Sequence, residues 1–261
     1  MERPYIFCHM ETSLDGKIMG KYLWRPTAED EGDSFDLVQH QEYHYEALML
    51  GRTTIDDNYT GYAVPEVNEN ATVPEGDYLA NGAKSGQYLI AIDGKGKLAW
   101  TGNTSPEGGK DAHIVEILTE KASAGYKDFL RKMGISYFIC GKDRVDLALA
   151  CHKIKTLLPV KTMMLGGGGV LNWSMIQEGL VDEISQIIAP AADGSTKTQT
   201  LFMAKEGITK DQPVLFKPLA VKIMEDGAVW IRWKVEEKVD FDFESDPVFK
   251  ETMDMINAHR E

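Results

Sequence analysis

The sequence predicts an α/β fold with a mixed, mostly parallel sheet and helices on both faces of that sheet. Apolar runs of strand length alternate with segments of helical period, which is typical of parallel strands joined by crossover helices. Some of these runs are apolar throughout, as expected of strands that are buried on both faces. Near the end of the chain, Asp226-Gly227 separates two β-rich runs and favours a tight turn. We therefore expect the sheet to end in a C-terminal antiparallel hairpin.

The first half of the chain supplies three predicted strands and one helix. A short apolar strand covers residues 5–10, and a helix begins near Asp33-Ser34 and runs through His44. Strands follow over 47–50 and 88–92. Residues 60–85 are rich in Gly, Pro, Asn and Glu, so we expect a long surface insertion rather than a linker between domains.

The second half continues this alternation. The pattern predicts strands over 114–118, 135–140 and 162–165, with helices over 121–132 and 145–158. A glycine run opens a helix that ends near Gly179, and a strand over 181–189 follows. The predicted hairpin strands cover 214–224 and 229–235. One domain is therefore expected over 1–235, followed by an acidic tail over 236–261 with a helix at about 247–259.

Composition limits the classes of partner and the compartment. The chain has 28 Lys and Arg against 41 Asp and Glu, and its formal net charge is −13. Phosphate backbones and anionic membranes repel such a chain, so we expect neither nucleic acid nor a membrane as partner. The N-terminus carries no apolar signal segment, and no stretch approaches the roughly 18 apolar residues that span a bilayer, which predicts a cytoplasmic protein. The cysteines form no CxxC pair and are interpreted as free thiols.

Four consecutive glycines, Gly166 to Gly169, form the most informative stretch. An apolar strand leads into them and a helix follows. Glycine allows a sharp turn and lets a ligand approach the backbone without a Cβ in the way, while the helix N-terminus favours a phosphate or diphosphate. The alternative is a tight strand-to-helix turn that binds nothing. The pattern is not GxGxxG, so a Rossmann dinucleotide site is not predicted.

Three motifs together resemble the reductase domain family of riboflavin biosynthesis. Residues 165–190, LGGGGVLNWSMIQEGLVDEISQIIAP, are similar to the family signature, and residues 10–18, METSLDGKI, match the segment after its first strand. Residues 50–57, LGRTTIDD, resemble the segment after its second strand. The resemblance implies a dihydrofolate-reductase-like fold, a homodimer, and NADPH-dependent reduction of the ribose of a phosphoribosylamino-pyrimidine. The deaminase domain common in the family is not expected, because the sequence has no HxE or PCxxC zinc pattern.

The resemblance also implies which residues hold the cofactor NADPH. The glycine loop and the first turn of its helix would bind the diphosphate, with further contacts after the second and third strands. The cofactor-binding residues implied are Gly166, Gly167, Gly168, Gly169, Val170, Leu171, Thr53, Thr54 and Gly94. For Thr54 the alternative role is helix capping.

Predicted substrate contacts come from the loop after the first strand and from an acidic pair after the second strand. They are Ser13, Asp15, Lys17, Asp56 and Asp57. Each of the charged ones has a structural alternative. Asp15 can form a turn before Gly16, Lys17 can be a solvated surface lysine, and the aspartates can stabilise the first turn of a helix.

No catalytic residue and no metal site is predicted. In hydride transfer the cofactor carries the chemistry, while the protein aligns the reactants and excludes water. His40 and His44 are four residues apart, a spacing that could bind a metal on one face of a helix, but no third ligand is evident. The same two histidines could instead border the substrate pocket.

The sequence departs from the family pattern in the substrate half of the site. The family has a glutamate just before its three glycines, where this chain has Gly166, and an arginine shortly after the aspartates, where residues 58–62 read NYTGY. Without that arginine a substrate phosphate loses a bidentate, charge-assisted partner. Two alternatives therefore stay open: a related reductase of a pterin or another carbonyl or imine compound, and a nucleotide-binding protein without turnover.

Overall fold

The computed structural model describes residues 1–24, 33–83, 86–107 and 110–259. Residues 84–85 of the expected insertion and 260–261 of the expected tail lie outside this range. The strands are β1 (Tyr5–Thr12), β2 (Ala47–Gly51), β3 (Tyr88–Ile92), β4 (Thr104–Glu107), β5 (Lys110–Leu118), β6 (Ser136–Ile139), β7 (Thr162–Leu165), β8 (Glu183–Ile188), β9 (Val214–Ile223) and β10 (Val229–Lys238). The helices are α1 (Ser34–Gln41), α2 (Arg52–Ile55), α3 (Ala124–Met133), α4 (Leu147–Leu157), α5 (Gly169–Gln177) and α6 (Pro247–Asn257), with a 3₁₀ turn at Lys21–Trp24 and a π turn at Asp56–Thr60.

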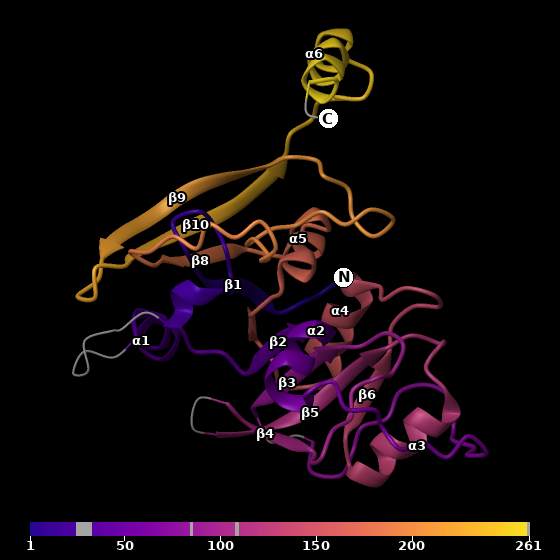
Figure 1. Ribbon diagram of the computed structural model, residues 1–261. Helices are drawn as coiled ribbons and strands as arrows, with labels where there is room; N and C mark the ends of the chain where they lie inside the picture. The colour runs from indigo at the N-terminus through magenta and orange to yellow at the C-terminus, as the bar shows by residue number, and fades with distance from the viewer. Residues whose placement is uncertain (25–32, 84–85, 108–109, 260–261) are drawn as a thin grey trace.

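All ten strands belong to one sheet, in the order β4-β5-β3-β2-β7-β1-β8-β10-β9, with β6 beside β5 (Figure 1). From β3 to β8 every neighbouring pair is parallel, whereas β10 is antiparallel to both of its neighbours, β8 and β9. This confirms the predicted fold class, a mixed and mostly parallel sheet that ends in an antiparallel hairpin. The sequence analysis missed β4, a four-residue strand that pairs with the start of β5.

Helices cover both faces of the sheet because successive strand residues point to opposite sides. On β1, Ile6 and Cys8 join a core cluster that contains residues of α4 and α5, whereas Phe7 joins a second cluster with residues of α2 and α3. On β2, Met49 and Leu48 divide in the same way. The fully apolar runs seen in the sequence are thus strands packed on both faces.

The first helix is shorter than predicted. Asp33 caps α1 by accepting from the N–H of Phe35, as expected, but the helix ends at Gln41 rather than continuing to His44. The cause is tertiary: Tyr43 stacks on Phe7 with ring centroids 4.1 Å apart, and its hydroxyl donates to the carboxylate of Glu183. These contacts take the chain out of the helical path, so His40 and His44 do not share a helical face.

The expected insertion covers the outer edge of β6. Tyr78 and Tyr137 exchange both backbone hydrogen bonds at 2.9 Å, so the segment runs beside β6 as an isolated bridge. The guanidinium of Arg131 lies 4.2 Å from the ring centroid of Tyr78. The described part of 61–87 contains no helix or strand of its own, and it shields an edge that would otherwise expose unpaired backbone groups.

The C-terminal region projects from the body. β9 and β10 are ten residues each, and β9 forms one edge of the sheet. The helix α6 follows, close to the predicted range, with no buried residue, and it stands apart from the rest of the molecule at the top of Figure 1. No helix in the described part of the chain is long and apolar enough to cross a membrane.

Candidate cofactor and substrate site

The candidate site lies where four parallel strands end side by side. In the sheet order β3-β2-β7-β1, the carboxyl ends of all four strands meet at the same edge. β7 leads into the glycine loop, β2 into α2, β3 into Asp93-Gly94 and β1 into the loop that begins at Ser13. Ligands of open parallel sheets bind outside the carboxyl ends of the strands, so the predicted cofactor and substrate residues gather at the expected edge.

The glycine loop turns from β7 directly into α5. Gly166 still belongs to the sheet, because its N–H donates to the carbonyl of Met49 at 3.0 Å. Gly167 has φ +99°, a backbone conformation that favours glycine, and its carbonyl accepts from the N–H of Gly51 at 2.9 Å. Gly168 is the N-cap of α5 and provides no capping side chain. The first N–H groups of a helix lack intrahelical partners, so the turn at Gly167 to Gly169 has the geometry of an anion-binding turn, and its role as a cofactor site stays a prediction.

The loop is a cradle that side chains would fill. A Cβ on Gly168 would lie 2.8 Å from Oε1 of Gln199 and 3.5 Å from the hydroxyl oxygen of Thr54. A Cβ on Gly169 would lie 2.2 Å from the carbonyl oxygen of Thr200, so that position admits only glycine. Backbone N–H groups, a hydroxyl and a carboxamide therefore surround Gly168. This donor set fits the diphosphate of a dinucleotide cofactor.

The other predicted cofactor residues surround this cradle. Thr54 is half-buried in α2 and Thr53 is exposed, while the N-cap of α2 is Gly51, so the alternative of Thr54 as the capping residue does not hold. Val170 and Leu171 are half-buried in the first turn of α5. Their roles as cofactor contacts remain predictions.

Gly94 lies at the end of the third strand and is packed closely. Its carbonyl accepts from the N–H and the hydroxyl of Thr119, at 2.9 and 2.5 Å. The preceding residue, Asp93, is buried and accepts from the N–H of Leu98 at 2.9 Å. Burial raises the pKa of the Asp93 carboxyl despite these hydrogen bonds. The loop that carries Gly94 is thus held in place from inside the protein.

The loop after β1 is held by its own polar side chains. Ser13 is buried, and its hydroxyl donates to Asp15 at 2.7 Å and accepts from the N–H of Lys17 at 3.0 Å. Asp15 also accepts from the N–H groups of Asp193 and Gly194, at 2.9 and 3.0 Å. The Asp193 N–H and the Ser13 hydroxyl lower the pKa of Asp15 to about 2. Asp15 thus links two loops, as in the turn-forming alternative, and contact of this loop with substrate remains a prediction.

The acidic pair after β2 divides into a buried and an exposed member. Asp56 is buried and accepts from the hydroxyl of Thr60 at 2.7 Å, with Arg52 at 3.5 Å. Asp57 is exposed and accepts from the hydroxyl of Tyr62. The carboxylate of Asp56 therefore stabilises the π turn, and Asp57 is the member that solvent and ligands can reach.

The described residues contain no group of three or more His, Cys, Asp or Glu side chains that could hold a metal ion. His40 and His44 are both exposed, on either side of the end of α1. Cys8, Cys140 and Cys151 are free and buried, as interpreted from the sequence.

Comparison with known proteins now decides the family. The chain matches the RibD C-terminal domain over residues 4–227. It belongs to the RibD C-terminal domain family. A 2,5-diamino-6-ribosylamino-4(3H)-pyrimidinone 5′-phosphate reductase of Methanothermobacter thermautotrophicus is 40% identical over 201 residues, 76% of this chain and 83% of that protein. A reductase of the same name from Aquifex aeolicus is 26% identical over 247 residues, 92% of this chain and all of that protein.

Solved structures of the RibD family share the fold. A pyrimidine reductase-like protein of Corynebacterium diphtheriae superposes with a TM-score of 0.60 at 17% identity, covering 90% of this chain and 92% of that chain. The riboflavin biosynthesis reductase Rib7 of Saccharomyces cerevisiae gives a TM-score of 0.58 at 16% identity, covering 90% of both chains. The resemblance inferred from three short motifs is therefore confirmed at the level of family and fold.

The place of the family glutamate is filled by leucines. A Cβ on Gly166 would lie 2.8 Å from Cδ2 of Leu50 and 3.0 Å from Cδ1 of Leu48. A glutamate at this position would require both side chains to move. The departure seen in the sequence is thus accommodated by packing, and it makes this corner of the RibD-type site more apolar.

One segment of the site was missed by the sequence analysis. Residues 190–203 lie between the loop after β1 and the start of α5 and place Gln199 and Thr200 against the glycines. Asp193 anchors the segment by accepting from the N–H of Lys21 at 2.9 Å. No motif marks these residues, because their role depends on a backbone path between elements that are distant in the sequence.

Proposed function

We propose that this chain is an NADPH-dependent reductase of 2,5-diamino-6-ribosylamino-4(3H)-pyrimidinone 5′-phosphate. The observation that carries the proposal is the turn at Gly168, where the polar side chains of Thr54 and Gln199 lie beside the N-terminus of α5. Such a turn suits a diphosphate. The activity named for the relatives supports the substrate, and the family resemblance supports NADPH over NADH.

In this reaction bound NADPH supplies a hydride to the ribose carbon of the substrate. The chain holds the diphosphate at Gly167 to Gly169 and Thr54, which fixes the reduced ring relative to the loop after β1. That loop is fixed in turn by Ser13 and Asp15. Alignment of this kind removes most of the entropic cost of bringing two reactants together, so an acid–base constellation is not needed for the transfer itself.

A second candidate substrate class follows from the apolar corner at Gly166. Leu48 and Leu50 fill the place of the family glutamate, and residues 58–62 lack the family arginine. A related reductase of a pterin or another carbonyl or imine compound would suit a site without these two charges. Product identification with the diaminopyrimidinone phosphate distinguishes the two candidates.

The first experiment is thermal unfolding of the chain with NADPH, NADP, NADH or no ligand. Binding to the native state raises the midpoint with the logarithm of ligand concentration over Kd. We expect the largest rise with the phosphorylated cofactors. Gly168→Asp places a carboxylate in the cradle and should weaken binding by roughly 100-fold or more through repulsion and lost space.

Gly102→Asp is the matched control, because a Cβ there has no neighbour nearer than 3.9 Å and the residue precedes β4, away from the glycine loop. This variant should keep the rise in midpoint. A well-folded chain whose midpoint responds to none of the cofactors would remove the basis of the proposed function.

We also propose a homodimer formed through the hairpin. β9 is a sheet edge that exposes Leu219, Val221 and Ile223 by 50%, 64% and 76%, and exposed apolar edge strands tend to pair with other chains. Light scattering should give twice the chain mass. V221E/I223E should give monomers, whereas the control L157E, on α4, should not, and a wild-type monomer at high concentration would contradict the proposal.

A further inference from the structure

The side chain of Gln199 lies over the glycine loop. Its Oε1 is 2.8 Å from the position that a Cβ on Gly168 would take, and the hydroxyl oxygen of Thr54 is 3.5 Å from the same position. The two polar side chains therefore flank Gly168 from different elements, Thr54 from α2 and Gln199 from the segment 190–203. Gln199 is half-buried and partly exposed to solvent.

The backbone on one side of Gln199 is fixed by the loop after β1. Its carbonyl accepts from the N–H of Ile18 at 3.0 Å, and Thr200 pairs with Lys17 as an antiparallel bridge. In the same loop, the carbonyl of Gly16 accepts from the N–H of Leu201 at 3.1 Å. Gln199 is thus held by the segment from which substrate contacts are predicted.

The other side of this segment is fixed to the start of α5. The N–H of Met203 donates to the carbonyl of Gly169 at 3.1 Å, and the side chain of Asn172 donates to the carbonyl of Leu201 at 3.2 Å. The carbonyl of Thr200 stands so close to Gly169 that any Cβ there would collide with it. The backbone is held from both sides, which fixes the Cα of Gln199 near the glycine loop, and its side chain is directed at Gly168.

We propose that Gln199 is a further cofactor-binding residue, whose carboxamide donates a hydrogen bond to the diphosphate in the glycine loop. The proposal rests on the proposed function and adds a residue to the same site. A carboxamide carries one acceptor oxygen and two N–H donors, so rotation of its last bond turns a donor to the place that Oε1 takes now. Hydrogen bonds to charged groups are stronger than neutral ones, so the contact would matter for affinity.

The experiment measures Kd by calorimetry on the full chain with two probes. NADPH contains the diphosphate, and adenosine 2′-monophosphate lacks it. Q199A should weaken NADPH binding by roughly 10-fold, the effect of one hydrogen bond to a charged group. Q199E should weaken it further, because a carboxylate repels the diphosphate. Both variants should bind adenosine 2′-monophosphate like the wild type and should keep its thermal midpoint without ligand.

Thr196→Ala is the control, since Thr196 is exposed on the same segment and uncharged. It should leave both Kd values unchanged. If Q199A binds NADPH as tightly as the wild type or more tightly, or loses both probes equally, Gln199 does not bind the diphosphate. In those cases the wild type still binds NADPH and the proposed function stands. A wild type that binds no NADPH overturns the proposed function and this inference together.

Discussion

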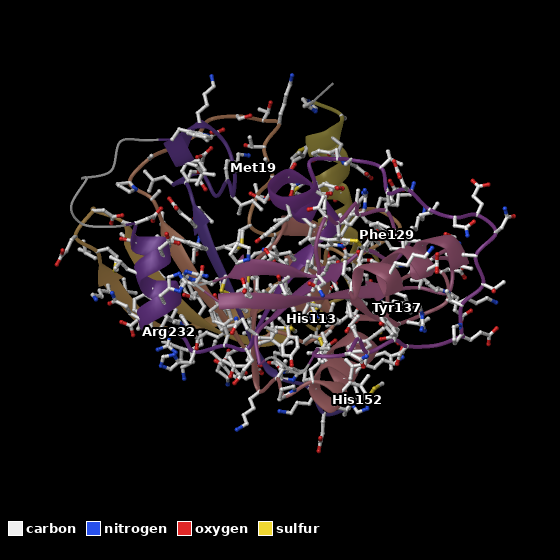
Figure 2. The ribbon with its side chains drawn as sticks, turned by 90° about the horizontal axis from the view of Figure 1, so that it is seen from below. Met19, His113, Phe129, Tyr137, His152 and Arg232 are labelled. Atoms are coloured by element: carbon white, nitrogen blue, oxygen red, sulfur yellow. The ribbon has the colours of Figure 1, made fainter. Side chains whose placement is uncertain are left out.

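The two ends of the parallel strands are built in opposite ways. At the carboxyl ends, the glycine loop places backbone groups beside the hydroxyl of Thr54 and the carboxamide of Gln199, which are both uncharged. At the amino ends, Glu183 is buried and accepts from Nε and Nη2 of Arg232, at 2.7 and 2.8 Å, and from the hydroxyl of Tyr5 at 3.0 Å. Figure 2 shows the same separation, with Met19 of the loop after β1 far from Arg232 and His152.

This difference shows that a dense group of hydrogen-bonded charged side chains does not mark the end of the sheet where the candidate site lies. Burial opposes ionisation of Glu183, but the hydrogen bonds from Arg232 and Tyr43 outweigh it and lower the pKa of the carboxyl. Both carboxylate oxygens of Glu183 thus accept from donors within the fold. At the carboxyl end, the N-cap of α5 has no side-chain cap, and the first N–H groups of a helix lack intrahelical partners, which suits an anion.

The largest expected effect tests whether the amino-end cluster is structural. Arg232→Ala leaves the Glu183 carboxylate buried without its cation, which should lower the free energy of unfolding by roughly 3 kcal/mol, near the low end for buried pairs because the arginine side chain is 37% exposed. Urea unfolding measures this. The double variant E183Q/R232M should recover part of the loss.

The NADPH Kd of Arg232→Ala should not change when it is measured under conditions in which the variant is folded. A parallel loss of cofactor affinity would mean that the two ends are coupled, and the comparison would fail.

A second prediction concerns His9, on β1 between the two ends. His9 is fully buried: its Nε2 lies 3.1 Å from the carbonyl oxygen of Phe35, and its Nδ1 lies 2.9 Å from the hydroxyl oxygen and 3.2 Å from the carbonyl oxygen of Ser185. The hydroxyl oxygen of Ser185 accepts from Trp230. Burial lowers the pKa of His9 to about 4. The unfolded chain binds a proton near pH 6.5 and the folded chain does not, so this stabilisation is complete above pH 6.5 and is lost as pH falls towards 4.

Between pH 7.5 and 5 this group should cost the wild type about 2 kcal/mol of unfolding free energy. The variant H9Q lacks the titrating imidazole. Over the same pH range its free energy of unfolding should therefore fall by about 2 kcal/mol less than that of the wild type. Urea titrations at the two pH values give the comparison. If both proteins lose the same free energy of unfolding between the two pH values, His9 is not held neutral in the folded chain.

The smallest effect sharpens the carboxyl-end side of the comparison. Thr54→Val keeps the shape of the side chain and removes the hydroxyl beside Gly168. We expect NADPH to bind about 10-fold more weakly, or 1.4 kcal/mol, with unchanged stability. Calorimetry and urea unfolding measure the two quantities. Thr156→Val, at an exposed position of α4, is the control, and a loss of stability without a loss of affinity would assign Thr54 to the fold instead.

Local patterns determined much of the architecture from sequence alone. The alternation of apolar runs and helical segments, the Asp226-Gly227 turn and the four glycines after β7 each depend on a few adjacent residues, and the structure contains all three features. The three motifs also identified the family. The physical reason is that side-chain period, turn geometry and backbone freedom are properties of short segments.

Tertiary structure decided what depends on residues that are distant in the chain. α1 stops at Gln41 because Tyr43 packs against Phe7 and Glu183, and Asp15 serves loops that meet only in the fold. Gln199 reaches Gly168 along a path fixed by two other segments. Such contacts leave no periodic or motif signal, because each one forms only when separate elements have already packed together.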